Sequence, residues 1–232
     1  MAKKLSKDEC DALLSIFNGK KNSFDSVLKE KTNNQGAIIS SVKKNATLIE
    51  LVPVFQFVFE NLCQNGQKKI SIEFKSTIYL KIFGTHIVKF GEYKKSLEKD
   101  SLTFIFNAKE IHCSVLIHVK DELASSLVNK SLGSSKSNQH SLGHAHSKID
   151  EAIILKHILI LAKELEVSIN SAFDKINLNY IRIENRPQLL SIIHPDDEVL
   201  LALIEISSEL ISGEFHVVIP ALGVKGLQGK KG

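Results

Sequence analysis

Three histidines, His140, His144 and His146, lie close together in the segment GSSKSNQHSLGHAH (133–146). Imidazole is the commonest metal ligand among side chains, so this spacing could hold a metal ion. No acidic residue or thiol in the segment completes a ligand set, and its Ser, Gly and Asn content is typical of a solvated loop. We therefore predict a loop here, with no metal and no cofactor.

The remaining histidines and the cysteines do not form a reactive group in the sequence. Cys10, Cys63 and Cys113 are odd in number and widely spaced, which indicates free thiols in a reducing compartment. His112 and His118 alternate with apolar residues and are expected on a solvent-facing side of a strand. A further histidine, at position 157, falls within a long apolar helix and is expected to be packed or half-exposed rather than catalytic.

A second pattern with chemical potential is Ser26-x3-Glu30-x2-Asn33. It resembles the signature of CheC-type chemotaxis phosphatases, in which the Glu anchors and the Asn orients a water that attacks an aspartyl phosphate. The residues after Asn33 lack the Gly-x-Gly-x-Ala continuation, and the long helix later in the chain has no Glu-x-x-Asn. We therefore favour a polar linker here, and keep a CheC-type phosphatase of phosphorylated CheY as the alternative function.

The length and composition of the chain limit which class of protein it can belong to. The chain has 232 residues, of which 43% are hydrophobic, and a formal net charge of +4. That length supports one sizeable core with tails. The basic residues are spread as pairs and Trp is absent, which argues against nucleic-acid binding. No apolar run approaches about 18 residues and the N-terminus lacks a signal-peptide core, so we expect a cytoplasmic protein without membrane insertion.

Hydrophobic periodicity predicts an α/β fold. After a polar stretch, a helix should start with Pro53 at its first position and end at Gln64-Asn65-Gly66. Strands are expected at 70–83, 102–106, 111–119, 178–184, 198–206 and 213–219, and helices at 121–132 and 147–173, the last opened by a capping box from Ser147 to Asp150. The order helix, strands, helix and then helix, strands suggests two related halves.

The N-terminus carries a complete helix-start signal. Ser6 is an N-cap with Glu9 three residues later, and an apolar edge follows. Such a helix packs either on its own domain or on a partner. The run resembles the N-terminal motif of the flagellar motor switch family FliM, which binds the phosphorylated response regulator CheY; Cys10 stands where that motif usually has Ile. The resemblance implies CheY-binding residues Leu5, Ser6, Asp8, Glu9, Asp11, Ala12, Leu13 and Leu14.

The C-terminal stretch carries the second resemblance. RIENRPQ, EVLLALIEI and SGEFHVVIPAL resemble the end of the FliM middle domain, which implies a pseudo-symmetric CheC/FliM-like α/β/α sandwich. In that family a Gly-Gly-x-Gly loop after a helix contacts the rotor protein FliG. The aligned residues here are Gly133, Ser134, Ser135 and Lys136, so one glycine remains.

The resemblance implies a division of the chain into a docking helix (1–18), a flexible linker (19–45), a middle domain (46–226) and a tail (227–232), without the FliN-like domain of a full switch subunit. It implies a non-enzymatic switch component or adaptor of chemotaxis and motor direction control, located at the cytoplasmic side of the basal body. Its partners would be phosphorylated CheY, FliG and FliN, with self-association in a ring.

Overall fold

The computed structural model describes residues 35–133, 146–173 and 175–228, with side chains described from Leu48 onward. The chain divides into two compact units, residues 1–47 and 48–232. Of the first unit, the structure describes only the helical backbone of residues 35–47. No described helix is long and apolar enough to cross a membrane.

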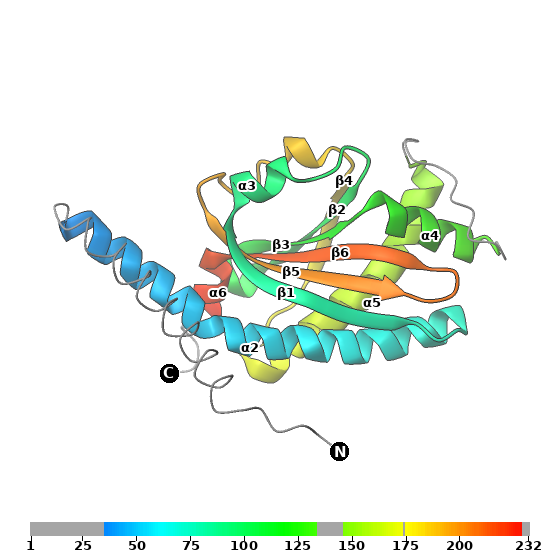
Figure 1. Ribbon diagram of the computed structural model, residues 1–232, viewed down its shortest axis with the longest axis horizontal. Helices are drawn as coiled ribbons and strands as arrows, with labels where there is room; N and C mark the ends of the chain where they lie inside the picture. The colour runs from blue at the N-terminus through cyan, green and yellow to red at the C-terminus, as the bar shows by residue number, and fades with distance from the viewer. Residues whose placement is uncertain (1–34, 134–145, 174, 229–232) are drawn as a thin grey trace, which may run out of the picture. The chain divides into compact units, whose positions relative to one another are not determined.

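A six-stranded antiparallel sheet forms the centre of the second unit, in the order β1-β5-β6-β3-β2-β4 (Figure 1). Every neighbouring pair in the sheet is antiparallel. The strands are β1 (Tyr79–Lys89), β2 (Leu102–Ala108), β3 (Cys113–Val119), β4 (Asn179–Glu184), β5 (Glu198–Ser207) and β6 (Ser212–Pro220).

Helical segments cover both faces of the sheet. The larger core lies on the face covered by α2 (Gln35–Phe74), α4 (Asp121–Ser131), α5 (Lys148–Ala172) and α6 (Ala221–Gln228). A smaller core on the opposite face lies under α3 (Phe90–Lys95) and the segment around the 3-10 helix η2 (Pro187–Leu189). A second 3-10 helix, η1 (Lys109–Ile111), joins β2 to β3. The expected α/β/α arrangement is confirmed.

The two halves of this unit repeat one topology. The first runs α2-β1-β2-β3-α4 and the second α5-β4-β5-β6-α6. The counterparts are β1 and β4, β2 and β5, and β3 and β6. Exchanging each strand for its counterpart gives the same strand order read from the opposite edge, with β3 and β6 paired at the centre and β1 and β4 at the edges. The pseudo-symmetry expected from the order of elements is therefore present in the sheet.

A shared hydrogen-bonding device ties each long helix to the chain that follows it. In the first half, Gln67 Oε1 accepts from the backbone N–H of Leu80 at 3.2 Å, and Ser71 Oγ accepts from that of Ile78 at 3.1 Å. Gln67 and Ser71 are one helical turn apart, so both side chains leave the same side of α2. They satisfy donors near the start of edge strand β1 that the sheet leaves unpaired.

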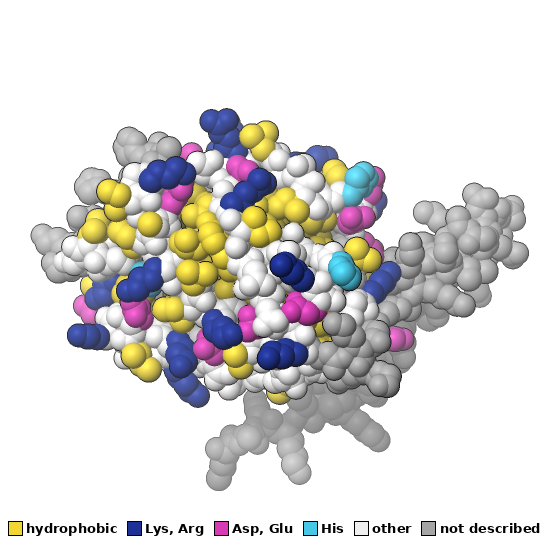
Figure 2. Space-filling model, turned by 180° about the vertical axis from the view of Figure 1, so that it is seen from behind, with side chains coloured by type: hydrophobic (Ala, Val, Ile, Leu, Met, Phe, Trp, Pro, Cys, Tyr) yellow, Lys and Arg dark blue, Asp and Glu magenta, His cyan; other side chains and the backbone are white. Residues whose placement is uncertain are grey.

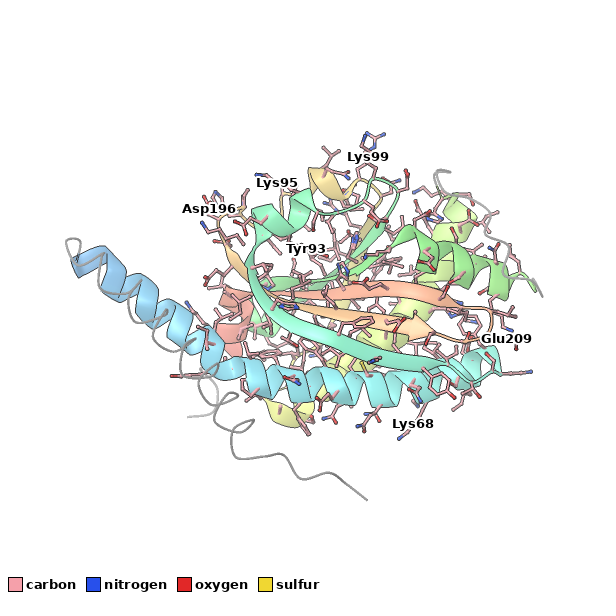
Figure 3. The ribbon with its side chains drawn as sticks, in the orientation of Figure 1. Lys68, Tyr93, Lys95, Lys99, Asp196 and Glu209 are labelled. Carbon is pink, nitrogen blue, oxygen red and sulfur yellow. The ribbon has the colours of Figure 1, made fainter. Side chains whose placement is uncertain are left out.

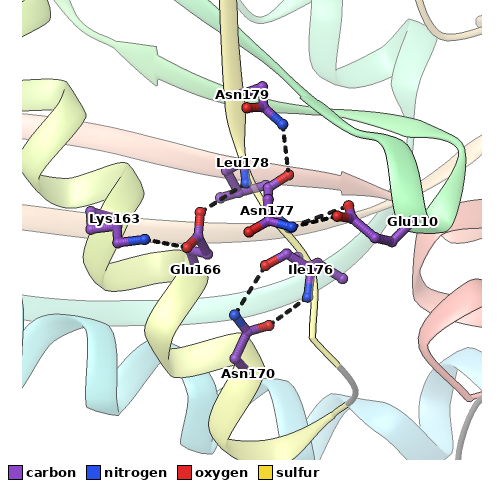
Figure 4. Close-up of polar contacts among 8 residues, drawn as sticks. All are labelled: Glu110, Lys163, Glu166, Asn170, Ile176, Asn177, Leu178 and Asn179. Carbon is purple, nitrogen blue, oxygen red and sulfur yellow. Dashed lines mark hydrogen bonds and ion pairs between the residues drawn. The ribbon is translucent and has the colours of Figure 1, made fainter.

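The second half repeats this device, with the helix residues ninety-nine positions and the backbone donors ninety-eight positions further along the chain (Figure 4). Glu166 Oε2 accepts from Leu178 N–H at 2.9 Å, and Asn170 bonds both the N–H of Ile176 at 2.8 Å and its carbonyl at 3.0 Å. Lys163 forms an ion pair with the other Glu166 oxygen. Because Ile176 is fully buried, its backbone groups have no water to replace Asn170.

The first long helix is the main correction to the sequence prediction. α2 begins at Gln35, inside the expected linker, and continues past Gly66 to Phe74 with Pro53 in its interior. Buried side chains at 51, 55, 58, 59, 62 and 70 follow helical spacing. The apparent strand alternation at Ile70 and Ile72 was misleading, because Ile70 is buried and Ile72 is 73% exposed.

Two residues expected to bound that helix have other roles. Pro53 has no N–H to donate to the carbonyl of Ile49. A helix interior tolerates this missing hydrogen bond best where the turn is solvated. Ile49 is exposed, so this turn is solvated. Gly66 permits close packing rather than ending the helix: a Cβ there would lie 3.1 Å from Leu161 Cδ2 of α5.

Other elements agree closely with prediction. The capping box at Ser147 and Asp150 is formed in both directions, and α5 follows it to Ala172. Strands β2 to β6 lie within one or two residues of their expected bounds. Ile149, in the first turn of α5, is 72% exposed and lies outside the buried face of this helix.

We predict that Asn170→Ala lowers the free energy of unfolding by about 2–4 kcal/mol, because it leaves two buried backbone groups of Ile176 without partners. Urea denaturation measures the change. Ser71→Ala, the counterpart in α2, should also destabilise. Asn179→Ala is the control, since its one side-chain hydrogen bond to another described residue is long, at 3.5 Å, and exposed. Equal effects from Asn170→Ala and Asn179→Ala would contradict this assignment.

Candidate functional site

Most residues that the sequence singled out lie outside the described part of the chain. This holds for the CheY-binding residues 5–14, for Ser26, Glu30 and Asn33, for 134–136 of the loop after α4, and for His140 and His144. Gly133 and His146, the residues on either side of the loop, are described.

Gly133 has a backbone conformation that favours glycine. It follows α4 with φ +86°, and its N–H donates to the carbonyl of Lys130 at 3.1 Å. A Cβ at this position would meet nothing within 4 Å, so a substitution would strain the backbone without a steric clash. The neighbouring Leu132 is 69% exposed. The described part of the candidate FliG-contact loop therefore presents a fixed glycine beside an exposed apolar side chain.

His146 lies against the first residue of α4. Its Nε2 lies 2.9 Å from Asp121 Oδ1, and both side chains are about nine-tenths buried. Burial raises the pKa of Asp121, against the lowering effect of His146. Among the described residues no group of three or more His, Cys, Asp or Glu could hold a metal ion. His146 therefore anchors the end of the loop to α4.

A chain of polar side chains crosses the face of the sheet under α3. Tyr93 points from α3 toward the sheet, and its hydroxyl lies 3.0 Å from His216 Nδ1 (Figure 3). His216 Nε2 lies 2.7 Å from Glu214 Oε1, and Lys120 Nζ donates to Glu214 Oε2 at 2.8 Å. The four residues link α3, β6 and the residue that precedes α4.

The direction of each hydrogen bond follows from the pKa values. Burial opposes ionisation of Glu214, but hydrogen bonds from Lys120 and His216 outweigh it and lower the pKa of this carboxyl. Burial lowers the pKa of His216 more than Glu214 raises it. A neutral His216 next to a carboxylate must donate from Nε2, so its Nδ1 accepts from the Tyr93 hydroxyl. In this one arrangement of protons, each hydrogen bond from Tyr93 to Lys120 has one donor and one acceptor.

His118 was expected on a solvent-facing side of its strand, and this is wrong. Its side of β3 faces away from the larger core, as expected, but α3 covers it and leaves His118 1% exposed. Its Nδ1 lies 2.9 Å from Thr103 Oγ1 on β2, and it pairs across the strands with His216. His112 is exposed, as expected. His157 is packed: its Nε2 lies 2.9 Å from Ser131 Oγ, and burial lowers its pKa.

A hollow of about 680 Å³ lies at the outer end of this polar chain. On the sheet, Glu205 and Glu214 are cross-strand neighbours of like charge, which is unfavourable unless a cation offsets it. Lys120 is the cation that offsets the charge of Glu214. The field of the hollow favours cations over anions. Its carboxylates are those of Glu98, Asp100, Asp121, Glu122, Glu205 and Glu214.

The side of the molecule turned away in Figure 1 carries exposed apolar side chains. Figure 2 shows hydrophobic side chains gathered near the middle of this side, with Lys and Arg around them. α5 and β4 carry exposed apolar residues: Ile149, Leu159, Val167, Tyr180 and Ile181. Such a surface suits contact with other proteins better than chemistry on a small molecule.

The polar chain from Tyr93 to Lys120 was not predicted from the sequence. Glu214 and His216 were read only as part of the last strand, although their two-residue spacing places them on one face of it. Tyr93 lies in a short helix that periodicity did not predict. A Glu-x-His pair on an otherwise apolar strand was the available signal.

Three comparisons with known proteins agree with this architecture. The family model described as flagellar motor switch protein FliM matches residues 49–230. The flagellar motor switch protein FliM of Caulobacter vibrioides (strain NA1000 / CB15N) is 20% identical over 221 residues, which cover 93% of this chain and 56% of that protein. The chain therefore spans about half the length of the curated relatives it matches.

Solved structures share the fold. The FliM middle domain from Vibrio alginolyticus has a TM-score of 0.66 at 18% identity, covering 75% of this chain and 98% of that one. A FliG–FliM complex from H. pylori has a TM-score of 0.73 at 14% identity, covering 78% and 98%. A FliY structure from Thermotoga maritima has a TM-score of 0.65 at 14% identity, covering 77% and 94%.

We predict that stability falls as the pH drops below about 6.5, partly through His118. Burial, with His216 and Lys120 nearby, lowers the pKa of His118 from 6.5 to about 3. Between these values only the unfolded chain binds the proton, so each unit of acidification costs up to about 1.4 kcal/mol. Above pH 6.5 the group is neutral in both states and contributes no slope.

The double variant Thr103→Val/His118→Leu removes both hydrogen-bonding partners and should flatten this pH dependence, as measured by urea denaturation from pH 8 to pH 5. His194→Gln, at an exposed histidine, is the control. An unchanged slope in the double variant would show that His118 is not the group responsible.

Proposed function

The chain belongs to the FliM family of flagellar motor switch proteins, and from this we propose that it is a component of the flagellar motor switch. The match over residues 49–230 carries the proposal, supported by the pseudo-symmetric sandwich of the same unit. In this role the protein works by binding other switch proteins at the cytoplasmic face of the motor, where the direction of rotation is controlled. It couples sites by binding rather than by catalysis.

The proposed regulator contact is the N-terminal helix motif. Residues 5–14 resemble the FliM segment that binds phosphorylated CheY, and a long tether would raise the local concentration of regulator at the motor. The departure at Cys10 removes apolar area relative to Ile, so the affinity should be lower than for a motif with Ile.

The proposed rotor contact is the end of α4 and the loop that starts at Gly133. A FliG–FliM complex exists among the proteins of this fold, which supports FliG as a partner here. Gly133 keeps the positive φ that such a loop needs, and Leu132 offers exposed apolar area next to it. FliN and further copies of the chain are additional proposed partners.

We predict that the full chain binds the CheY-type regulator of its host more tightly when the regulator carries a phosphoryl mimic. Deletion of residues 1–20 should abolish this difference, as measured by calorimetric titration. Cys10→Ile should strengthen binding several-fold, because it adds about two buried methylene equivalents to the apolar edge.

Asn33→Ala is the control, and should change neither the binding of the regulator nor the lifetime of its phosphoryl group. Faster loss of the phosphoryl group with the wild-type chain, abolished by Asn33→Ala, would instead identify a CheC-type phosphatase. Equal binding with and without residues 1–20 would remove the docking role.

We predict that Gly133→Ala weakens capture of FliG while leaving the fold intact. Alanine at this φ costs about 1 kcal/mol or more, and the strain falls on the loop. Leu132→Ser should weaken the same interaction, whereas Leu222→Ser, at an equally exposed leucine on α6, should not. Biolayer interferometry with immobilised FliG measures all three. A loss that is the same for Leu132→Ser and Leu222→Ser would place the contact elsewhere.

A further inference from the structure

A second hollow, of about 460 Å³, lies at the end of the sheet where β2 begins and β4 ends. It shares Asp100 with the hollow of about 680 Å³ described above, but basic and amide side chains form most of its lining. Three segments meet there: the α3–β2 connection with Lys99 and Asp100, the β4–η2 connection with Asn185, Arg186 and Gln188, and His146 before α5. Figure 3 shows Lys99 beside η2, on the far side of the molecule from α2.

The side chains that line this hollow are mainly hydrogen-bond donors. Arg186 and Lys99 supply two fixed positive charges, and Asp100 is its one carboxylate among the described residues. Neither Arg186 nor Lys99 forms an ion pair among those residues. The charge of the hollow is therefore available to a ligand.

The backbone that carries these donors is held firmly. The Arg186 N–H donates to Glu184 Oε1 at 3.1 Å, Pro187 follows with a fixed φ, and the Arg186 carbonyl accepts from Leu189 N–H at 2.8 Å. On the other wall, Ser101 Oγ donates to the Glu98 carbonyl at 2.6 Å and closes the turn that carries Lys99.

The two walls are also tied to each other and to a buried floor. Gln188 Nε2 donates to the carbonyl of Leu97 at 3.4 Å, which joins the two connections. Leu102, at the floor, is 1% exposed. His146 is held by Asp121, and its side chain is 8% exposed. A hollow with a rigid frame needs less ordering of its walls when a ligand binds.

From this geometry we propose that the hollow binds an oxyanion, either a phosphate or a carboxylate group, on a small molecule. A guanidinium presents two parallel N–H groups that match two oxygens of such an anion, and a nearby ammonium adds charge without fixing orientation. Carboxamides of Asn185 and Gln188 can meet further polar atoms of the ligand. The volume fits a ligand larger than the anion alone. The proposal stands apart from the motor-switch role and does not depend on it.

The test is a titration of the full chain, followed by ¹H–¹⁵N NMR, with inorganic phosphate and separately with acetate, against sodium chloride at matched ionic strength. We expect saturable shifts at Arg186, Gln188, Lys99 and His146. The anion that binds more tightly shows whether the site prefers a phosphate or a carboxylate group. Arg186→Gln should weaken binding about tenfold or more, because it removes a charge-assisted pair of hydrogen bonds.

The chain offers a matched control, since Arg182 is its only other arginine and lies on β4, four residues before Arg186 and outside the hollow, with its side chain 57% exposed. Arg182→Gln should leave the affinity unchanged. Asp100→Asn should tighten binding, a gain that loss of folding could not produce. Shifts that sodium chloride reproduces, that never saturate, or that persist in Arg186→Gln would overturn the proposal.

Discussion

Interleaving of the two halves of the sheet is the constraint on which the rest of the structure depends. Strand β1 of the first half pairs only with β5 of the second, and β4 of the second pairs only with β2 of the first. Neither half contains a complete sheet, so neither can bury its apolar faces alone. The long helices cover a surface that exists only after the halves have joined, and the capping of each edge strand by its preceding helix makes the arrangement specific.

The two faces of this sheet have different roles. One carries a large apolar core under four helices, as a stable scaffold requires. The other is only partly covered, and there the polar chain from Tyr93 to Lys120 seats α3 on the sheet with one consistent set of hydrogen bonds. Buried networks of this kind specify a geometry when every member is satisfied.

Apolar strands bounded by turn residues and helices with marked starts were predictable from local sequence. The capping box at Ser147 and strands β2, β5 and β6 belong to this class, and the family resemblance supplied the layer arrangement. α2 was not predictable in this way, because its proline and glycine are stop signals whose meaning depends on tertiary packing against Leu161. His118 failed for a similar reason: α3, which covers it, is too short to show a period. Long-range hydrogen bonds such as those of Asn170 leave no local pattern at all.

The distance along the chain between paired strands has a consequence for how the protein is made. Tyr79 pairs with Ser207, so β1 must wait for more than a hundred further residues to be synthesised before its partner exists. A high contact order of this kind slows folding, because loop closure precedes the gain from pairing. Until then β1 is a nascent strand with exposed Phe83 and Tyr79, open to pairing with other chains on neighbouring ribosomes. The helix before it, already bonded to its first residues through Gln67 and Ser71, would cover the outer edge of β1 during the interval and leave open the edge that awaits β5.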